Sequence, residues 1–228
     1  MGNHIGTLAE KSLHAGIKAW YGRQDDQFEV EVDGFVIDIV RGEQLVEIQT
    51  RHLYAMKRKL TKLLDRHPIH VLHPIPQEKW IVRQTAEGEP VSRRKSPKRG
   101  QVLNIFDELV RIPHLLPHPN LTIGVLLTQQ EEIWRDDGLG SWRRKGWSVY
   151  DCRLLGVVEY VTFVSLADFN AMLPFDLPQP FTSRELGQAL RCYPALAQKI
   201  VYTLRKTGGL AVTGKQGKAF LYKVTTPG

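Results

Sequence analysis

Three consecutive short stretches near the start of the chain predict β-strands: residues 28–32 alternate hydrophobic and polar positions, and residues 35–40 and 45–50 are apolar runs interrupted by single polar residues. The same pattern analysis predicts a helix on either side of them, over residues 8–21 and 53–64. A further strand at 69–75, another helix at 102–111 and two strand-rich stretches at 121–128 and 148–164 follow. The order helix, three strands, helix, strand is typical of an α/β layer and not of an all-β barrel.

A proline-rich segment, LPFDLPQPF, interrupts this pattern at residues 173–181. Its three prolines prevent a continuous helix or strand, so the segment predicts a boundary between two parts of the chain. We therefore predict an N-terminal α/β domain over residues 1–172, a proline-rich linker over 173–180 and a small C-terminal domain over 181–228.

The C-terminal part has the start and stop signals of two helices followed by a hairpin. Thr182 and Glu185 form the pattern of a capping box, and Pro194 stands at a helix start that tolerates proline. A Gly-Gly pair ends the second helix, and two alternating strands follow around a Gly-Lys-Gln-Gly turn. This order of elements resembles a winged helix-turn-helix.

In a winged helix, the second helix is the recognition helix, and the hairpin contacts the phosphate backbone. The resemblance implies DNA-binding roles for Gln198, Lys199, Tyr202, Arg205 and Lys206 on the helix and for Lys215 and Lys218 on the hairpin. Winged helices also serve as protein-docking modules. Cations on both elements favour DNA here.

The predicted hairpin at residues 33–50 carries acidic residues within its apolar strands. If Gly42 and Glu43 form a tight turn with Gly42 in the first central position, Asp38 falls directly opposite Glu47. Side chains alternate along a strand, so Gln49 shares their face. Opposed Cβ atoms are only about 4.5–5.5 Å apart, so two carboxylates there repel unless one is protonated, a cation lies between them or both reach water.

The apolar neighbours of the two acids indicate buried strands, which favours a bound cation with hard oxygen ligands, Mg²⁺ or Mn²⁺. In the alternative interpretation, both acids lie on the solvated face of an edge hairpin and have no chemical role.

Glu10 on the first helix, Asp38 on one strand and Glu47-Ile48-Gln49 on the next resemble the motif of the PD-(D/E)xK nuclease superfamily. The resemblance implies a restriction-endonuclease-like mixed sheet flanked by helices, and hydrolysis of phosphodiester bonds assisted by Mg²⁺. It makes Asp38 and Glu47 the metal-binding carboxylates, with the carbonyl of Ile48 as a further ligand and Glu10 completing the site. A glutamate in the first turn of a helix is also favoured by the helix dipole alone.

One residue departs from the family pattern, because Gln49 stands where most members have lysine. Glutamine can position water but supplies no charge, although some active restriction enzymes of the superfamily carry it. A cation from the following helix could substitute, and Lys57 is the first candidate. Otherwise the fold survives as a binding scaffold without catalysis.

Two clusters of cations predict contact with a polyanion. SRRKSPKRG, residues 92–100, is interpreted as a loop that follows a phosphate backbone through Arg93, Arg94, Lys95, Lys98 and Arg99. SWRRKGW, residues 141–147, places three cations between Trp142 and Trp147. We expect these tryptophans to close the core, stacking on exposed bases being the alternative.

The composition agrees with a nucleic-acid partner, since 31 Lys and Arg against 24 Asp and Glu give a net charge of +7. No stretch has the length of a membrane span or the form of a secretion signal, and two cysteines fit a reducing cytoplasm. The leading hypothesis is a metal-dependent DNA endonuclease. The others are a non-catalytic DNA-binding or regulatory protein on a nuclease-like scaffold and a protein-interaction module. Duplex-cutting members of the superfamily often act as dimers, so a homodimer remains open.

Overall fold

A seven-stranded mixed sheet forms the centre of the protein in the computed structural model, which describes residues 5–225 and, among these, the side chains from residue 12 onward. The strand order is β1-β2-β3-β4-β6-β7, and β5 pairs with the outer part of β4. The strands are β1 (Gln27–Val32), β2 (Phe35–Arg41), β3 (Gln44–Ile48), β4 (Ile69–Gln84), β5 (Pro90–Lys95), β6 (Leu121–Arg135) and β7 (Ser148–Phe163). Strands β3, β4 and β6 are parallel, and the remaining pairs are antiparallel.

The first three strands form the predicted meander, and their turns explain its register. Asp33 and Gly34 both have positive φ, as a type I′ turn requires. Gly42 has a φ of 57°, which glycine adopts without a Cβ clash, and the pairs Arg41–Gln44 and Val40–Leu45 follow from it. The register predicted from the Gly42 turn is confirmed.

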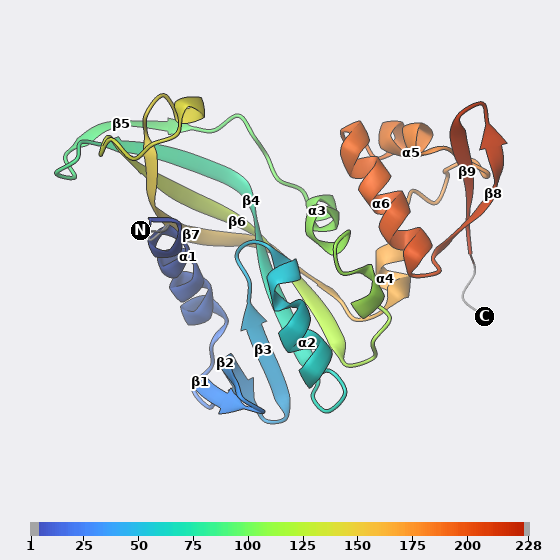
Figure 1. The fold of residues 1–228 in the computed structure, drawn as a ribbon, viewed down its shortest axis with the longest axis horizontal. Coiled ribbons are helices and arrows are strands. Elements are labelled where there is room, and N and C mark those ends of the chain that lie inside the picture. Colours follow the sequence, from blue (N-terminus) through green and yellow to red (C-terminus); the bar gives the residue numbers. More distant parts are fainter. Residues whose placement is uncertain (1–4, 226–228) are drawn as a thin grey trace.

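Helices cover both faces of the sheet, as predicted (Figure 1). Helix α1 (Ile5–Tyr21) packs on one face, where Leu13 and Ile17 join a buried cluster with residues of β2, β3, β4, β6 and β7. The opposite face carries η1 (Leu53–Met56), α2 (Lys57–Leu63), η2 (Val102–Ile105), α3 (Phe106–Leu109) and η3 (Pro113–Leu115). The chain thus crosses from β3 to the parallel strand β4 through α2.

Strand β4 is twice as long as predicted, because its prolines lie where they remove no sheet hydrogen bond. The N–H of Gln49 donates to the carbonyl of Leu72, so the even-numbered residues of β4 direct their backbone N–H and C=O groups toward β3. Pro74 and Pro76 are also even-numbered, but β3 ends at Ile48, so no strand lies on that side of them. Proline is tolerated at such an open edge.

The outer halves of β4, β6 and β7, together with β5, project beyond the helices as an arm, residues 77–95 and 129–153 (upper left of Figure 1). The prediction that residues 92–100 form a loop was therefore wrong for Ser92–Lys95, which pair with β4. Charged residues on an edge strand protect it from pairing with other chains, and here they concealed the strand from pattern analysis.

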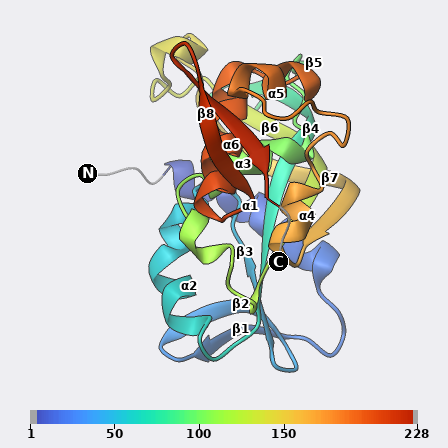
Figure 2. The same ribbon diagram turned by 90° about the vertical axis from the view of Figure 1, so that its right-hand side faces the viewer.

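Helix α4 (Leu166–Asn170) follows β7, and the C-terminal part contains α5 (Ser183–Ala189), α6 (Pro194–Lys206), β8 (Leu210–Gln216) and β9 (Ala219–Val224). These elements face the viewer in Figure 2. The predicted capping box is confirmed: the N–H of Thr182 donates to Glu185 Oε2 at 2.7 Å, and the N–H of Glu185 donates to Thr182 Oγ1. The buried faces of α5 and α6 belong to the same hydrophobic cluster as α2 and α3.

Between residues 5 and 225, no helix is both long enough and apolar enough to span a membrane.

Candidate functional site

Asp38 and Glu47 lie where strands β2 and β3 begin to diverge. The last backbone pair is Ile39–Val46, one residue before the two acids would oppose each other. Beyond it, the carboxylate of Asp38 replaces a backbone partner, because its Oδ2 accepts a hydrogen bond from the N–H of Ile48 at 2.8 Å. This bond fixes the position of Asp38 relative to β3.

Helix α1 supplies the basic side chains around Asp38. His14 Nε2 lies 3.0 Å from Oδ2 and Lys18 Nζ lies 3.2 Å from Oδ1. Burial alone would raise the pKa of Asp38, but the hydrogen bonds from His14 and Ile48 and the charge of Lys18 outweigh it and lower the pKa. Burial would likewise lower the pKa of Lys18, yet its contacts with Glu29 and Asp38 raise it. Asp38 is therefore ionised at neutral pH.

Glu47 is only 6% exposed, and its cation comes from the opposite layer. Lys59 of α2 forms an ion pair with Oε1, although no aligned hydrogen bond reaches this oxygen, and its ammonium also donates to the carbonyl of Val36 at 2.6 Å. Burial raises the pKa of Glu47 to about 7, and the negative charge of Asp38 adds to this while Lys59 opposes it. Glu47 is thus balanced between its two protonation states near neutral pH.

Basic side chains of α1 and α2 contact the two acids at the position of the predicted metal site. Among the residues that the structure describes, no three His, Cys, Asp or Glu side chains are grouped to hold a metal. Glu10 lies on α1 one turn before His14, and its side chain is outside the described residues. Two carboxylates, one with an oxygen lacking an aligned hydrogen bond, do suit a hard cation as ligands.

The cation from the second helix is Lys59 and not Lys57, which corrects the sequence prediction. Lys57 is exposed on the outer side of α2 and makes no ion pair with either acid. Residues two positions apart in an α-helix are separated by about 200° around its axis, so only one of these two lysines can face β3. Gln49 is half-buried, and its Nε2 donates to the carbonyl of Arg51.

Three residues of this site were missed from the sequence: His14, Lys18 and Lys59. His14 and Lys18 could have been found from the sequence of α1, where Glu10, His14 and Lys18 recur every four residues and therefore share one helix face. Lys59 carried no such signal, since α2 contains three lysines and one arginine.

A cavity of about 300 Å³ opens beyond the end of β3, the position at which parallel sheets commonly bind ligands. Its lining includes His73, Lys79, Gln130 and Glu132. His73 Nδ1 donates to the carbonyl of Gln49 at 2.7 Å, and burial lowers its pKa, so the ring is neutral. Burial would raise the pKa of Glu132, but the charge and hydrogen bond of Lys79 keep it lowered.

The predicted phosphate-binding cluster of the arm divides into paired and free cations. Arg93 pairs with Glu131, while Lys95 and Arg99 share Glu78. Within the described residues, Arg94 and Lys98 are exposed and have no ion-pair partner.

The predicted recognition helix α6 exposes Gln198, Tyr202, Arg205 and Lys206. Lys199 instead faces α3, where its ammonium lies 2.7 Å from Asp107 Oδ1 and holds α6 in place. Lys215 and Lys218 are exposed on the hairpin, with the Lys215 ammonium 5.0 Å from the ring centre of Phe220.

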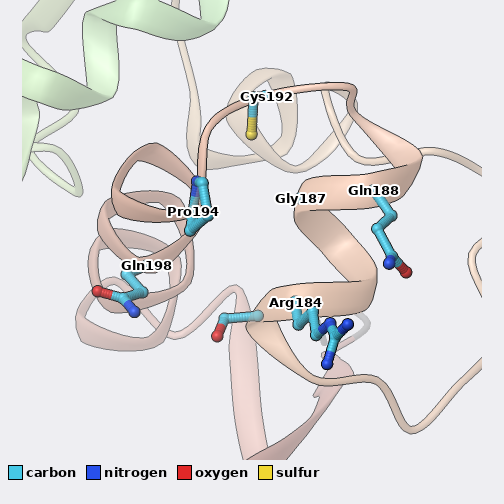
Figure 3. A pocket seen from close by; sticks show the side chains of 7 residues that line it. Arg184, Gly187, Gln188, Cys192, Pro194 and Gln198 are labelled. Carbon is cyan, nitrogen blue, oxygen red and sulfur yellow. The ribbon is translucent and has the colours of Figure 1, made fainter.

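A second cavity, of about 420 Å³, lies between α5 and the start of α6 (Figure 3). Arg184 and Gln188 border it from α5, Gln198 and Pro194 border it from α6, and Cys192 lies on the connecting turn.

Comparison with known proteins identifies relatives of this chain but no characterised function. An "Uncharacterized protein" of Treponema pallidum (strain Nichols) is 31% identical over 228 residues, which covers 98% of this chain and 89% of that protein. No solved structure matches. Residues 11–164 match the family model described as "Domain of unknown function (DUF8091)". The chain therefore belongs to the DUF8091 family.

Proposed function

We propose that this protein is a metal-dependent DNA endonuclease of the PD-(D/E)xK type, with a C-terminal winged helix that positions the DNA. The observation that carries the proposal is the hairpin β2–β3, which brings Asp38 and Glu47 together directly before a helical crossover to the parallel strand β4. The helix of that crossover also supplies a cation, Lys59, to the acid on β3.

Asp38 and Glu47 would hold the metal, together with the carbonyl of Ile48. A bound Mg²⁺ supplies activation of water and stabilises charge on the scissile phosphate. Asp38 is ready for this role because its contacts hold it ionised. Glu47 has a pKa of about 7, so a further positive charge beside it favours the ionised form.

Lys59 takes the part of the lysine that the family motif has at the position of Gln49. Its ammonium already lies against Glu47, so it is placed to stabilise negative charge that develops on a phosphate bound there. His14 and Lys18 hold Asp38 from the other side and set its orientation.

The second candidate is a non-catalytic DNA-binding protein on the same scaffold. It is favoured by the charge balance of the site, since side-chain cations from α1 and α2 neutralise both acids without a metal.

Cleavage of plasmid, single-stranded and branched DNA with Mg²⁺, Mn²⁺ or EDTA separates the two candidates. We expect metal-dependent cleavage that Asp38→Asn abolishes and that Lys59→Met reduces by about 100-fold, the effect of losing one group that stabilises transition-state charge. Lys57→Met, two residues away on the exposed side of α2, is the matched control and should cleave like the wild type. DNA binding without any metal-dependent cleavage would establish the second candidate instead.

A further inference from the structure

The tip of the arm carries an indole ring that nothing in the described structure covers. The tip connects β6 to β7 through residues 136–147 and contains one short turn of helix, η4 (Trp142–Arg144) (Figure 1). Trp142 is 82% exposed, so the prediction that it closes the core was wrong. Trp147 is half-buried, with the Arg83 guanidinium 5.0 Å from its ring centre.

The tip is a closed loop that holds Trp142 outward. Its two ends touch at glycines, because a Cβ on Gly140 would lie 1.7 Å from the carbonyl oxygen of Gly146. The carbonyl of Ser141 accepts hydrogen bonds from the N–H groups of Arg144 and Gly146, at 3.0 and 3.1 Å. A loop with these internal bonds presents its side chains in a fixed arrangement, which lowers the entropy lost on binding a partner.

The tip carries three cations that have no acidic partner among the described residues, and one of them lies over this ring. The guanidinium of Arg143 lies 5.5 Å from the ring centre of Trp142. Arg143, Arg144 and Lys145 make no ion pair with any residue that the structure describes. The tip also contains Asp136 and Asp137, and Asp137 accepts hydrogen bonds from Ser148 and from the N–H of Leu139. The tip therefore combines an open aromatic face with free positive charge.

The flanks of the arm repeat the combination of aromatic ring and cation. Arg93 and Lys95 lie over the ring of Trp80, at 5.2 and 5.0 Å, and the guanidinium of Arg135 stacks on Tyr150 at 3.3 Å. Aromatic faces between cations match the chemistry of a strand with unpaired bases, whose phosphates need neutralising and whose bases need a surface to stack on.

We propose that the tip binds unpaired bases of a nucleic acid, with Trp142 stacking on a base and Arg143, Arg144 and Lys145 contacting the neighbouring phosphates. The inference deepens the proposed function and rests on its nucleic-acid partner, though not on catalysis. It names the substrate class as nucleic acid with a single-stranded segment, such as a bubble or a branch. An intact duplex hides its base faces and offers the ring no stacking site except at an end.

Fluorescence anisotropy with labelled DNA tests the proposal in EDTA, where no metal-dependent cleavage occurs. The probes are a single strand, a blunt duplex, and the same duplex with a central bubble of mismatched bases. Trp142→Ala should weaken binding of the single strand and the bubble about tenfold, within the range found for the loss of one stacked base, and leave the duplex unchanged. Trp142→Phe, which keeps a ring, should retain most of the binding.

Phe175→Ala is the matched control, because Phe175 is a fully exposed aromatic residue of the proline-rich segment, and it should bind all three probes like the wild type. An equal loss of all probes in Trp142→Ala, or no loss, would overturn the proposal. Failure of the wild type to bind any probe would overturn it too and indicate a protein partner for the tip. If Trp142→Ala weakens binding of the single strand and the bubble only, but no DNA is cleaved, the endonuclease proposal alone would be overturned.

Discussion

Replacing Glu47 by glutamine probes how burial controls the charge of this site. The side chain is buried, and its pKa in the folded protein is about 7 against an ordinary value of 4.5. A group with a raised folded pKa binds its proton more tightly in the native state. Its contribution to stability is therefore complete below pH 4.5 and is lost as the pH rises to about 7.

The size of the effect follows from the same two pKa values. Each pKa unit corresponds to about 1.4 kcal/mol, so the interval from 4.5 to about 7 corresponds to a loss of about 3 kcal/mol in the free energy of unfolding. Glutamine does not titrate, so the Glu47→Gln variant should gain about 3 kcal/mol relative to the wild type across that interval.

The wild type must be compared with Glu47→Gln because His70 changes the stability of the wild type with pH in the opposite direction to Glu47. Burial, helped by the charge of Arg41, lowers the pKa of His70 to about 4, so its stabilising effect is lost as the pH falls from 6.5. His73, whose pKa burial also lowers, acts in the same direction, so the two histidines oppose Glu47 in the wild type. In Glu47→Gln the opposing effect of Glu47 is absent, and stability should rise with pH more steeply than in the wild type.

Urea unfolding followed by tryptophan fluorescence, at half-unit steps from pH 4.5 to 8, measures the difference. Glu31→Gln, which replaces an exposed carboxylate on β1, should give a curve parallel to that of the wild type. Parallel curves for Glu47→Gln and the wild type would show that Glu47 titrates alike in the folded and unfolded states, and the account of its burial would be refuted.

Two further predictions concern the packing of the fold. Asp107→Asn weakens the charged contacts to Lys199 and Tyr193, at 2.7 and 2.6 Å, and should cost about 1 kcal/mol, seen as faster proteolysis of the C-terminal part; unchanged proteolysis would contradict this. Gly124→Ala places a Cβ within 2.7–2.9 Å of three neighbouring side chains and should lower the free energy of unfolding by about 1–3 kcal/mol in urea, whereas Gly156→Ala has room and should not.

The sequence was sufficient for the order of elements around the site, because each element there carries its own local signal. Gly42 set the hairpin register, and the capping box at Thr182 marked the start of α5. The lengths of β4, β6 and β7 could not be read in this way. Whether Pro74 and Pro76 end a strand depends on what lies beside it, which is information about neighbours and not about the residues themselves.

The candidate site was predictable to the same degree. The opposition of Asp38 and Glu47 follows from counting residues away from a turn, and their closeness is reflected in the pKa of Glu47. The choice between Lys57 and Lys59 depends on the angle at which α2 lies across the sheet, and no local pattern contains that angle. Exposure of Trp142 was hidden for a similar reason, because a tryptophan in a turn has the same sequence pattern whether or not another element covers it.

The buried cluster that joins α5 and α6 to α2 and α3 has a practical consequence for work on the isolated parts. The family match ends at residue 164, but Phe181, Leu186 and Ile200 are among the side chains that complete the hydrophobic interior begun by the earlier helices. A gene shortened to the matched region would leave the apolar side of α3 open to water, and its product would tend to aggregate. Studies of the acids on the hairpin therefore require the full-length polypeptide.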